Sequence, residues 1–266
     1  MNMEVNKALF YKITYDMTTS EHERFNIGTY KEKKLHRILK LYLEPDSAYH
    51  EIPFEGYIAD IKKENRIIEI ETSGFTGLRE KLDAFLPTCQ VTLVYPITSV
   101  RTISWIDPES GEISPKRRSP KKENIYDLLF ECIYILDYLA NPNLTILGVC
   151  LEMQEYRMLD GWSRDRKRGS HRYERIPTDI FEIISLQGRD SYKAIVPDDC
   201  KSDFTMKQFC QSIGKNQYTG RAIMKILQKL EIVSRTGKKG RCLLYTRTDL
   251  LPEAQRREDT CISEKN

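Results

Sequence analysis

The sequence lacks the long apolar runs, paired cysteines and strong charge imbalance that characterise several common classes of protein. No stretch reaches the roughly 20 apolar residues of a membrane-spanning helix. The first 20 residues contain no basic segment followed by an apolar one, so we expect no signal peptide. The seven cysteines are scattered and form no CxxC pair. This predicts reduced thiols, a cytoplasmic location and no zinc site.

The charges of the two signs are nearly balanced. The 42 lysines and arginines exceed the 39 aspartates and glutamates by three, which gives a net charge of +3. The total charge therefore indicates no partner, and only its distribution is informative. Hydrophobic residues make up 40% of the chain and charged residues 30%, as in folded globular proteins. A length of 266 residues is enough for two domains.

The most informative stretch is Gly56–Leu86, which contains three acidic residues on two predicted strands. The first strand ends at Asp60, and the second, Arg66–Thr72, carries Glu69 and Glu71. Because side chains alternate along a strand, the two glutamates share one face and the isoleucines beside them occupy the other. Unpaired carboxylates are costly inside a sheet. The pattern therefore indicates that the three carboxylates converge on a divalent hard cation.

Apolar periodicity predicts the elements around this stretch. The first 20 residues are expected to form either a short strand, Ala8–Tyr15, or a loosely ordered arm. Helical spacing of apolar residues predicts helices at Gly28–Leu43, Thr76–Leu86 and Asn124–Leu139. The continuous apolar run Val91–Pro96 predicts a strand that is buried on both faces. Further strands are predicted at Val100–Ile106 and Leu144–Met153. This alternation of helices and strands predicts an α/β domain.

Two of these helices place polar groups on their core-facing sides. Glu32 and His36 fall on the apolar stripe of Gly28–Leu43, and Lys81 lies among the apolar residues of Thr76–Leu86. One interpretation is structural: a half-solvated Glu–His pair, and a lysine whose stem lies along apolar surface. The other is that both faces look into a site, in which Lys81 would pair with the carboxylates.

The last third of the chain shows a different order of elements. The predicted helices are Thr178–Leu186, Thr205–Ile213 and Gln217–Leu230. They precede a predicted hairpin formed by Glu231–Arg235 and Arg241–Thr246. This order resembles a winged helix-turn-helix, which places one helix in the major groove of DNA. Basic and aromatic side chains on the third helix and the hairpin are candidate nucleic-acid contacts: Tyr218, Arg221, Lys225, Lys229, Arg235, Lys238, Lys239 and Arg241. The alternative is that this module packs against the first domain or another protein.

Two further segments are strongly basic. One is a loop whose side chains either grip backbone phosphates or form only a solvated turn: Lys116, Arg117, Arg118, Lys121 and Lys122. The other, Asp160–Arg175, has no apolar pattern and is interpreted as a linker. The alternative is that its basic side chains contribute to nucleic-acid binding. The predicted organisation is an α/β domain at 1–160, a basic linker at 161–176, the winged helix at 177–250 and a polar tail at 251–266.

The first domain resembles the PD-(D/E)XK nuclease superfamily. Asp60, an eight-residue gap and then Glu69-Ile70-Glu71-Thr72 closing a hydrophobic strand match the metal-binding core of that family. The predicted helix, three strands, helix and strand follow its order of elements. The resemblance implies a restriction-endonuclease-like mixed central sheet flanked by helices, plus the small winged-helix domain. The segments Gly28–Lys40 and Arg117–Lys122 also resemble uncharacterised bacterial proteins of this superfamily.

The resemblance also implies roles for individual residues. Asp60 and Glu69 would ligate the metal, and Glu32 matches the acid on the first helix that holds a metal-bound water. The lysine that is usual at the third motif position is replaced by Glu71, and Lys81 on the following helix is the candidate to supply the missing amine. Ligation by oxygen alone favours Mg²⁺ or Mn²⁺ as the cofactor.

These observations predict a metal-dependent nuclease that hydrolyses phosphodiester bonds of nucleic acid, with DNA as the first choice of substrate. The alternative is a catalytically inactive protein of nuclease fold that binds DNA or regulates another process. In a third hypothesis the acidic pattern is coincidental, and Glu32, Asp60 and Glu69 do not converge. A homodimer is compatible with the nuclease hypothesis, because many nucleases that cut both strands act as dimers. No membrane partner is expected.

Overall fold

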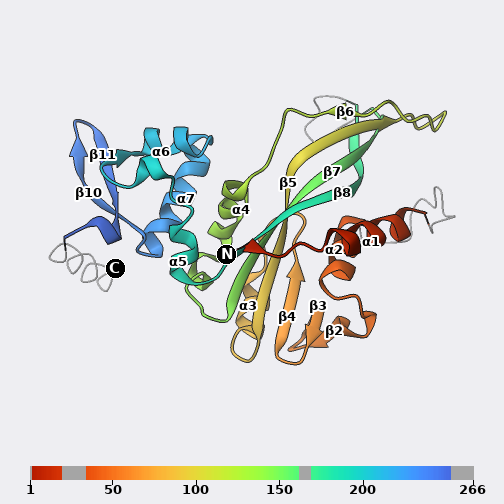
Figure 1. Ribbon diagram of the computed structural model, residues 1–266, viewed down its shortest axis with the longest axis horizontal. Helices are drawn as coiled ribbons and strands as arrows, with labels where there is room; N and C mark the ends of the chain where they lie inside the picture. Colours follow the sequence, from red (N-terminus) through yellow and green to blue (C-terminus); the bar gives the residue numbers. More distant parts are fainter. Residues whose placement is uncertain (1, 20–33, 162–168, 253–266) are drawn as a thin grey trace. The chain divides into compact units, whose positions relative to one another are not determined.

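The computed structural model describes residues 2–19, 34–161 and 169–252. The chain is mixed α/β, with helices flanking a large mixed sheet, as the sequence predicted at this level (Figure 1). It divides into two compact units, each built from several segments. Unit 1 contains residues 1–74, 84–125 and 146–185, and unit 2 contains residues 75–83, 126–145 and 186–266. In the described part of the chain, no helix is long and apolar enough to span a membrane.

Unit 1 is organised around a mixed sheet. Its strands are β1 (Asn2–Met3), β2 (His50–Phe54), β3 (Tyr57–Lys63), β4 (Arg66–Ile70), β5 (Gln90–Ile106), β6 (Arg117–Arg118), β7 (Leu144–Met158) and β8 (His171–Leu186). Their order is β1-β8-β7-β5-β4-β3-β2, and β6 pairs with β5 outside this path. The strands β2, β3 and β4 are antiparallel neighbours, whereas β4 and β5 are parallel. Along the chain, α2 (Lys34–Leu43) precedes β2 and α3 (Arg79–Phe85) separates β4 from β5.

Tight turns fix the register of the antiparallel strands. Glu55 and Gly56, between β2 and β3, have φ angles of 48° and 79°, the left-handed geometry that short hairpin turns require. Glu64 adopts the same geometry between β3 and β4, with a φ of 54°. The resulting register pairs Ile61 with Ile68, so Asp60 and Glu69 are the next residues along these two strands.

The strand β5 is a single strand of 17 residues where the sequence predicted two. Ile97 and Thr98, which lie between the predicted strands, are 0% and 1% exposed. No turn forms there, because these residues are buried in the same sheet as those on either side. Leu93 and Val94 are also fully buried, so burial of the predicted apolar run is confirmed.

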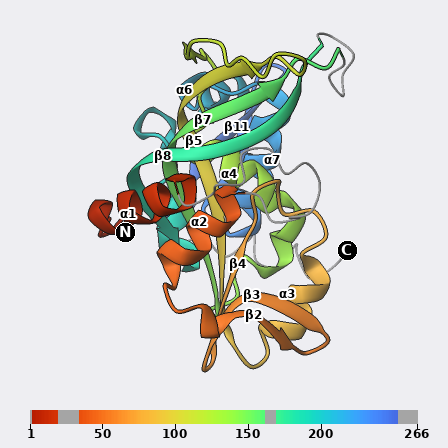
Figure 2. The same ribbon diagram turned by 90° about the vertical axis from the view of Figure 1, so that its right-hand side faces the viewer.

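Helix α1 (Lys7–Thr19) replaces the strand or arm predicted for the first 20 residues. Phe10, Ile13 and Met17 recur every three or four positions, which is the spacing of one helix face, and they pack into the core with α2. The rings of Phe10 and Tyr42 meet edge to face, with centroids 5.6 Å apart. Figures 1 and 2 show α1 and α2 side by side against the sheet. The strand prediction was wrong because this helical spacing was overlooked.

The largest departure from the sequence prediction is β8. This strand covers residues that were predicted as the end of a basic linker and as a helix, Thr178–Leu186, and for these residues both predictions are wrong. Its buried residues recur at every third position, which imitates helical spacing: Pro177, Ile180, Ile183 and Leu186. The strand forms because β7 and β1 flank it in the sheet and its backbone groups pair with theirs. Unit 1 therefore extends to Ser185, beyond the predicted boundary at 160.

Unit 2 contains short helices and a small sheet. Its helices are α4 (Ile125–Glu131), the 3-10 helix Cys132–Tyr138, α5 (Gly188–Lys193), α6 (Met206–Ser212) and α7 (Gln217–Lys229). Its strands are β9 (Phe204–Thr205), β10 (Val233–Lys239) and β11 (Cys242–Arg247), in the order β10-β11-β9. The two helices and the hairpin predicted for residues 205–246 are confirmed. The single helix predicted for Asn124–Leu139 instead changes from α to 3-10 geometry after Glu131.

Local capping explains why the sequence located α6 and α7 well. The Thr205 hydroxyl accepts the N–H of Gln208, whose side chain bonds back to the Thr205 backbone, forming a capping box. The Asn216 side chain accepts the N–H of Thr219 at 2.9 Å. On the inner face of α7 and at its C-cap, Ile223, Ile226, Leu227 and Leu230 are buried, and Ala222 is half-buried.

The close packing of α6 against α7 predicts an effect of Gly220→Ala that depends on its neighbour. A Cβ atom at Gly220 would lie 2.4 Å from Sγ of the buried Cys210. We expect Gly220→Ala to lower the free energy of unfolding by about 1–3 kcal/mol, the usual cost of overpacking. In a Cys210→Ala background the same change should raise it by up to about 1 kcal/mol, because alanine favours helix more than glycine does. Urea unfolding measures the change in the free energy of unfolding in each background. Destabilisation in both backgrounds would contradict the close contact between Gly220 and Cys210.

Candidate functional site

Asp60 and Glu69 lie at the point where β3 and β4 separate. The backbone register of these strands ends at Ile61 and Ile68. Beyond it, side chains replace the ladder: the Ile70 N–H donates to Oδ2 of Asp60 at 2.8 Å, and the Asp60 N–H donates to Oε1 of Glu69 at 3.3 Å. The second of these hydrogen bonds joins Asp60 to Glu69, and the first joins Asp60 to the residue after Glu69, so the two acidic residues lie beside each other.

Helix α2 presents His36 and Lys40 to this carboxylate pair. Nε2 of His36 lies 3.1 Å from Oδ2 of Asp60. Lys40 is only 3% exposed, and its Nζ donates to Oε1 of Glu51 at 3.0 Å. Burial raises the pKa of Asp60, but the contact with His36, a backbone N–H and the charge of Lys40 together outweigh it, so its pKa lies below the usual range. We define the carboxylate cluster as Asp60, Glu69, His36 and Lys40.

The other predicted site residues are distributed differently. Glu32 lies outside the described residues. Glu71 follows β4 and is half-buried, and its N–H donates to the carbonyl oxygen of Val94 at 2.8 Å. This bond continues the parallel pairing of β4 with β5. Lys81 is half-buried on α3 and belongs to unit 2, whereas the carboxylate cluster belongs to unit 1.

The carboxylate cluster offers hard oxygen ligands, which suit Mg²⁺ or Mn²⁺. Within the described part of the chain, the side-chain contacts of Asp60 with His36 and with the Ile70 N–H both use Oδ2, so Oδ1 is the oxygen that could hold a cation. Mg²⁺ commonly takes one or two protein carboxylates and completes its shell with water and phosphate oxygens. Asp60 and Glu69 fit that requirement. The described residues contain no group of three His, Cys, Asp or Glu side chains that could hold a metal, so they do not form a closed cage of protein ligands.

Lys40 is a candidate functional residue that the sequence interpretation missed. It follows His36 by four residues and therefore lies on the same side of α2, one turn further on. A lysine at this spacing on a core-facing stripe was the available signal. The resemblance to the nuclease superfamily pointed instead to Lys81, on the helix after the acidic strand.

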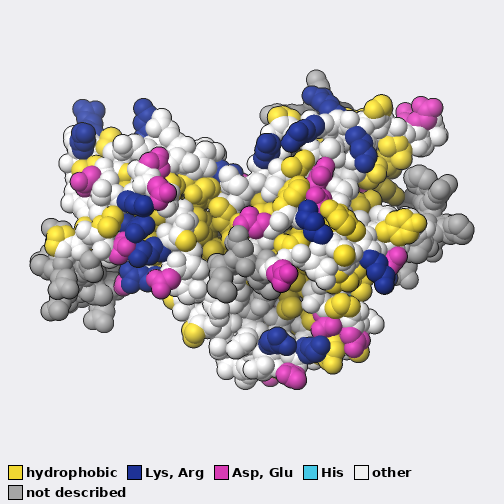
Figure 3. Space-filling model, viewed as in Figure 1, with side chains coloured by type: hydrophobic (Ala, Val, Ile, Leu, Met, Phe, Trp, Pro, Cys, Tyr) yellow, Lys and Arg dark blue, Asp and Glu magenta, His cyan; other side chains and the backbone are white. Residues whose placement is uncertain are grey.

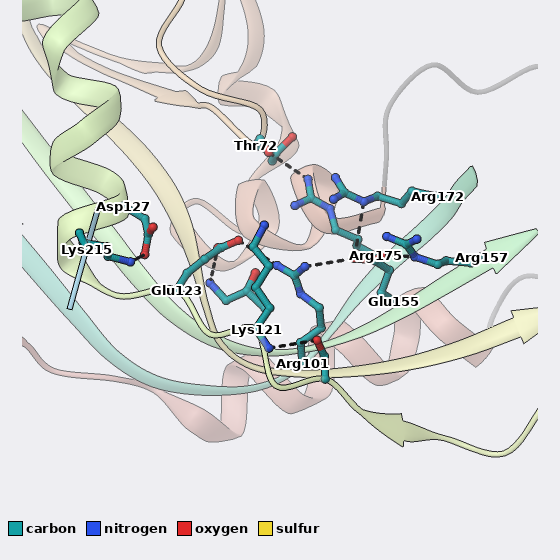
Figure 4. Close-up of polar contacts among 12 residues, drawn as sticks. Thr72, Arg101, Lys121, Glu123, Asp127, Glu155, Arg157, Arg172, Arg175 and Lys215 are labelled. Atoms are coloured by element: carbon teal, nitrogen blue, oxygen red, sulfur yellow. Dashed lines mark hydrogen bonds and ion pairs between the residues drawn. The ribbon is translucent and has the colours of Figure 1, made fainter. Parts of the chain in front are cut away.

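A second group of charged side chains lies on the strands of unit 1 (Figure 4). This arginine cluster consists of Arg101 on β5, Arg157 on β7, Arg172 and Arg175 on β8, and the carboxylates of Glu123 and Glu155. Glu155 is central and 0% exposed. Its Oε1 accepts from Nε of Arg157 at 2.7 Å. Its Oε2 lies 3.5 Å from Nε of Arg172 and 3.8 Å from Nη1 of Arg101.

The remaining contacts join this cluster to neighbouring strands. Nη2 of Arg101 donates to Oε1 of Glu123 at 2.8 Å. Nη2 of Arg175 donates to the carbonyl oxygen of Thr72 at 2.9 Å, just after β4 ends. Burial lowers the pKa of Arg175, and the positive charges of Arg172 and Arg101 lower it further, against the opposing effect of the two glutamates. The sequence interpretation missed this cluster because it assigned the stretch containing Arg172 and Arg175 to a linker.

The predicted basic loop adjoins the arginine cluster. Arg117 and Arg118 form β6, which pairs with Ile103 and Thr102 of β5. The N–H of Ser119 donates to the carbonyl oxygen of Arg101 at 2.9 Å. All five basic side chains of the loop are exposed, namely Lys116, Arg117, Arg118, Lys121 and Lys122. The loop is therefore anchored to the sheet while its charges face solvent.

In unit 2, all the predicted nucleic-acid contacts are exposed: Tyr218, Arg221, Lys225, Lys229, Arg235, Lys238, Lys239 and Arg241. Basic side chains stand out at the tip of the β10–β11 hairpin (Figure 3). Arg221 donates to the side chain of Gln217 on the same helix, and two α7 residues contact other elements of the unit. The ring of Tyr218 lies 5.5 Å from that of Phe130, and Nζ of Lys229 lies 3.9 Å from Oδ1 of Asp137. One edge of the basic face of α7 is thus turned toward α4 and the 3-10 helix.

The fold and these sites define a mixed α/β protein with two charged clusters on one large sheet. The chain belongs to the family defined by a domain of unknown function, DUF8091, whose model matches residues 33–187. That range contains the carboxylate and arginine clusters and ends one residue after β8. The chain is also 27% identical over 168 residues to an uncharacterized protein of Treponema pallidum (strain Nichols), covering 63% of this chain and 64% of the relative. No solved structure matches the chain.

Proposed function

We propose that this protein is a metal-dependent nuclease that hydrolyses phosphodiester bonds of nucleic acid, with DNA as the first candidate substrate. One observation carries the proposal: two hydrogen bonds, from the Asp60 N–H to Glu69 and from the Ile70 N–H to Asp60, hold the two acidic residues side by side where β3 and β4 separate. The order of α2, three antiparallel strands, α3 and a parallel β5 around them supports a restriction-endonuclease-like arrangement of the PD-(D/E)XK kind.

In this proposal the residues of the carboxylate cluster have separate roles. Asp60 and Glu69 hold one Mg²⁺ or Mn²⁺ ion, which when bound supplies a nucleophilic water and a counter-charge for the phosphoryl group. His36 would fix the Asp60 carboxylate through Oδ2 and leave Oδ1 to hold the ion. Lys40 supplies the positive charge that Glu71 cannot supply, and stabilises the negative charge that develops on the phosphate oxygens.

We further propose that unit 2 docks the enzyme on its substrate. The order of α6, α7 and the β10–β11 hairpin supports a winged helix-turn-helix, in which α7 enters a groove and the hairpin contacts phosphates. Arg221 and Lys225 are the α7 residues best suited to this role, because Tyr218 and Lys229 also contact α4 and the 3-10 helix. The hairpin contributes the flanking charges of Arg235, Lys238, Lys239 and Arg241.

The test is a titration followed by a cleavage assay. Isothermal titration of Mg²⁺ and Mn²⁺ into the full chain is expected to show binding, and supercoiled plasmid should be nicked only when one of these ions is present. Excess EDTA should stop the nicking. If neither ion binds, the nuclease proposal fails. If the ions bind but no DNA or RNA is cleaved, the protein is a nucleic-acid-binding relative of these enzymes.

Two lysine variants separate the candidates for the catalytic amine. We expect Lys40→Gln to lower the nicking rate about 10²–10³-fold, the usual cost of losing a group that stabilises developing charge, and Lys81→Gln to retain nearly the wild-type rate. Because Lys40 is buried and paired with Glu51, Glu51→Gln serves as the control. It breaks the ion pair but keeps the amine, and should change the rate only a few-fold. The opposite ranking of the two lysine variants would assign the role to Lys81.

A second function is favoured by a specific observation. Asp60 already has a side-chain partner in His36, and the described residues contain no group of three potential metal ligands. Such a protein can bind nucleic acid without cutting it. This alternative predicts mobility shifts of labelled DNA that are equal in Mg²⁺ and in EDTA, together with intact DNA at the end of the reaction.

A further inference from the structure

We propose that the arginine cluster of unit 1 is a binding site for a phosphate group of a polynucleotide, separate from the carboxylate cluster. That the cluster binds a phosphate group follows from its own residues. That this phosphate belongs to a polynucleotide rests on the proposed function.

The cluster has more positive charge and more donors than its own carboxylates can satisfy. Four guanidinium groups face two glutamates, which leaves a surplus of two positive charges. Four guanidinium groups carry roughly 20 N–H donors, whereas two carboxylates offer roughly eight lone-pair sites. Arg101 is only 8% exposed, and among the described residues neither its Nε nor Oε2 of Glu155 has a hydrogen-bond partner, although Oε2 lies within ion-pair distance of Arg172 and Arg101. A buried donor without an acceptor is costly, so an external oxyanion would lower the free energy of this arrangement.

The arginines are held in place and remain accessible. Glu155 is fully buried and contacts three of them, so it orients their planar groups without neutralising them all. The exposed fraction of the side chain rises from 9% at Arg101 to 32% at Arg157 and 45% at Arg172. The cluster therefore opens to solvent on one side. Guanidinium groups in fixed orientations suit phosphate oxygens, which they bind through paired N–H donors.

The position of the cluster favours a polymer over a small anion. Arg175 bonds to the carbonyl oxygen of Thr72, three residues after Glu69 of the carboxylate cluster. On the other side, Ser119 of the exposed basic loop bonds to the backbone of Arg101. A strand of nucleic acid lying along this surface would present successive phosphates to the basic loop and the arginine cluster, near the end of β4.

The test measures binding without cleavage. A short fluorescein-labelled single-stranded oligonucleotide, and a duplex of the same sequence, are titrated with the full chain in EDTA and followed by fluorescence anisotropy. We expect Arg175→Gln and Arg172→Gln each to weaken binding about tenfold and to lower the slope of log Kd against log salt by about one. Arg66→Gln is the matched control. It removes one exposed charge at the opposite end of β4 and should change Kd less than about twofold.

Thermal unfolding separates binding from a purely structural role. Because the unliganded guanidinium groups repel one another, Arg175→Gln and Arg172→Gln should keep or raise the Tm, and inorganic phosphate should raise the Tm of the wild type more than that of either variant. A lowered Tm with oligonucleotide binding equal to that of Arg66→Gln would overturn the site. If inorganic phosphate raises the Tm of the wild type but neither variant changes oligonucleotide binding, the proposal that the bound phosphate belongs to a polynucleotide is overturned.

These outcomes are independent of the nuclease activity. Asp60→Asn should bind the oligonucleotide like the wild type in EDTA, because Asp60 is not part of the arginine cluster. If no variant or wild-type protein cleaves nucleic acid but binding still depends on Arg172 and Arg175, the nuclease proposal fails and the phosphate site stands. If cleavage is observed and the two arginine variants bind and cleave like Arg66→Gln, the phosphate site fails and the nuclease proposal stands.

Discussion

Asp60→Asn is expected to abolish metal-dependent cleavage while the protein stays folded. Asparagine keeps an oxygen that can accept the Ile70 N–H, which Asp60 now accepts at 2.8 Å. It loses the negative charge that makes the side chain a ligand for a divalent ion. We expect the nicking rate of supercoiled plasmid to fall by at least about 10³-fold and the heat of Mg²⁺ binding to disappear in isothermal titration.

The matched control for Asp60→Asn is Glu64→Gln. Glu64 is an exposed acid in the turn that joins β3 to β4, so this variant removes the same charge from the same hairpin. It should bind the ion and nick plasmid within about twofold of the wild type. A thermal midpoint of Asp60→Asn within a few degrees of the wild type would show that the fold is retained. Cleavage at the wild-type rate by that folded variant would exclude Asp60 as a metal ligand.

Glu155→Gln is expected to be severely destabilising. The carboxylate is fully buried and lies between 2.7 and 3.8 Å from the guanidinium groups of Arg157, Arg172 and Arg101. Without its charge, these cations repel one another with only Glu123 left to balance them. Removing one partner of a buried ion pair costs about 3–5 kcal/mol, and we expect a loss of this size in the free energy of unfolding measured with urea at neutral pH.

The same strand provides a control for that prediction. Glu152 is half-buried on β7, and Glu152→Gln should change the free energy of unfolding by less than about 0.5 kcal/mol. Combining Glu155→Gln with Arg172→Gln should recover about 1 kcal/mol, because one of the unbalanced charges is removed with its partner. Equal, small effects of Glu152→Gln and Glu155→Gln would show that the buried carboxylate does not stabilise the cluster.

Features that depend on short stretches of chain could be predicted from the sequence. Asp60 and Glu69 lie on two strands joined by one tight turn at Glu64, so alternation along each strand was enough to indicate that the two residues lie beside each other. Helices α6 and α7 begin at Thr205 and Asn216, whose side chains cap them through contacts with residues three positions away. In both cases the deciding interactions are local.

The fold of β8 and the cations of both clusters depend on contacts between segments that are distant in sequence. The residues of β8 have a spacing that suits a helix, and they form a strand because β7 and β1 offer hydrogen-bond partners on both sides. The same pairing brings Arg172 and Arg175 to Arg101 and Glu155, from strands that are distant in sequence. Lys40 likewise lies close enough to lower the pKa of Asp60 only because α2 packs on the sheet. The sequence by itself determined the acidic hairpin and the capped helices, since their interactions span a few residues. Only the tertiary structure determined which cations surround the carboxylates. The cause is that burial and long-range strand pairing select these cations, and the local spacing of residues does not distinguish one candidate cation from another.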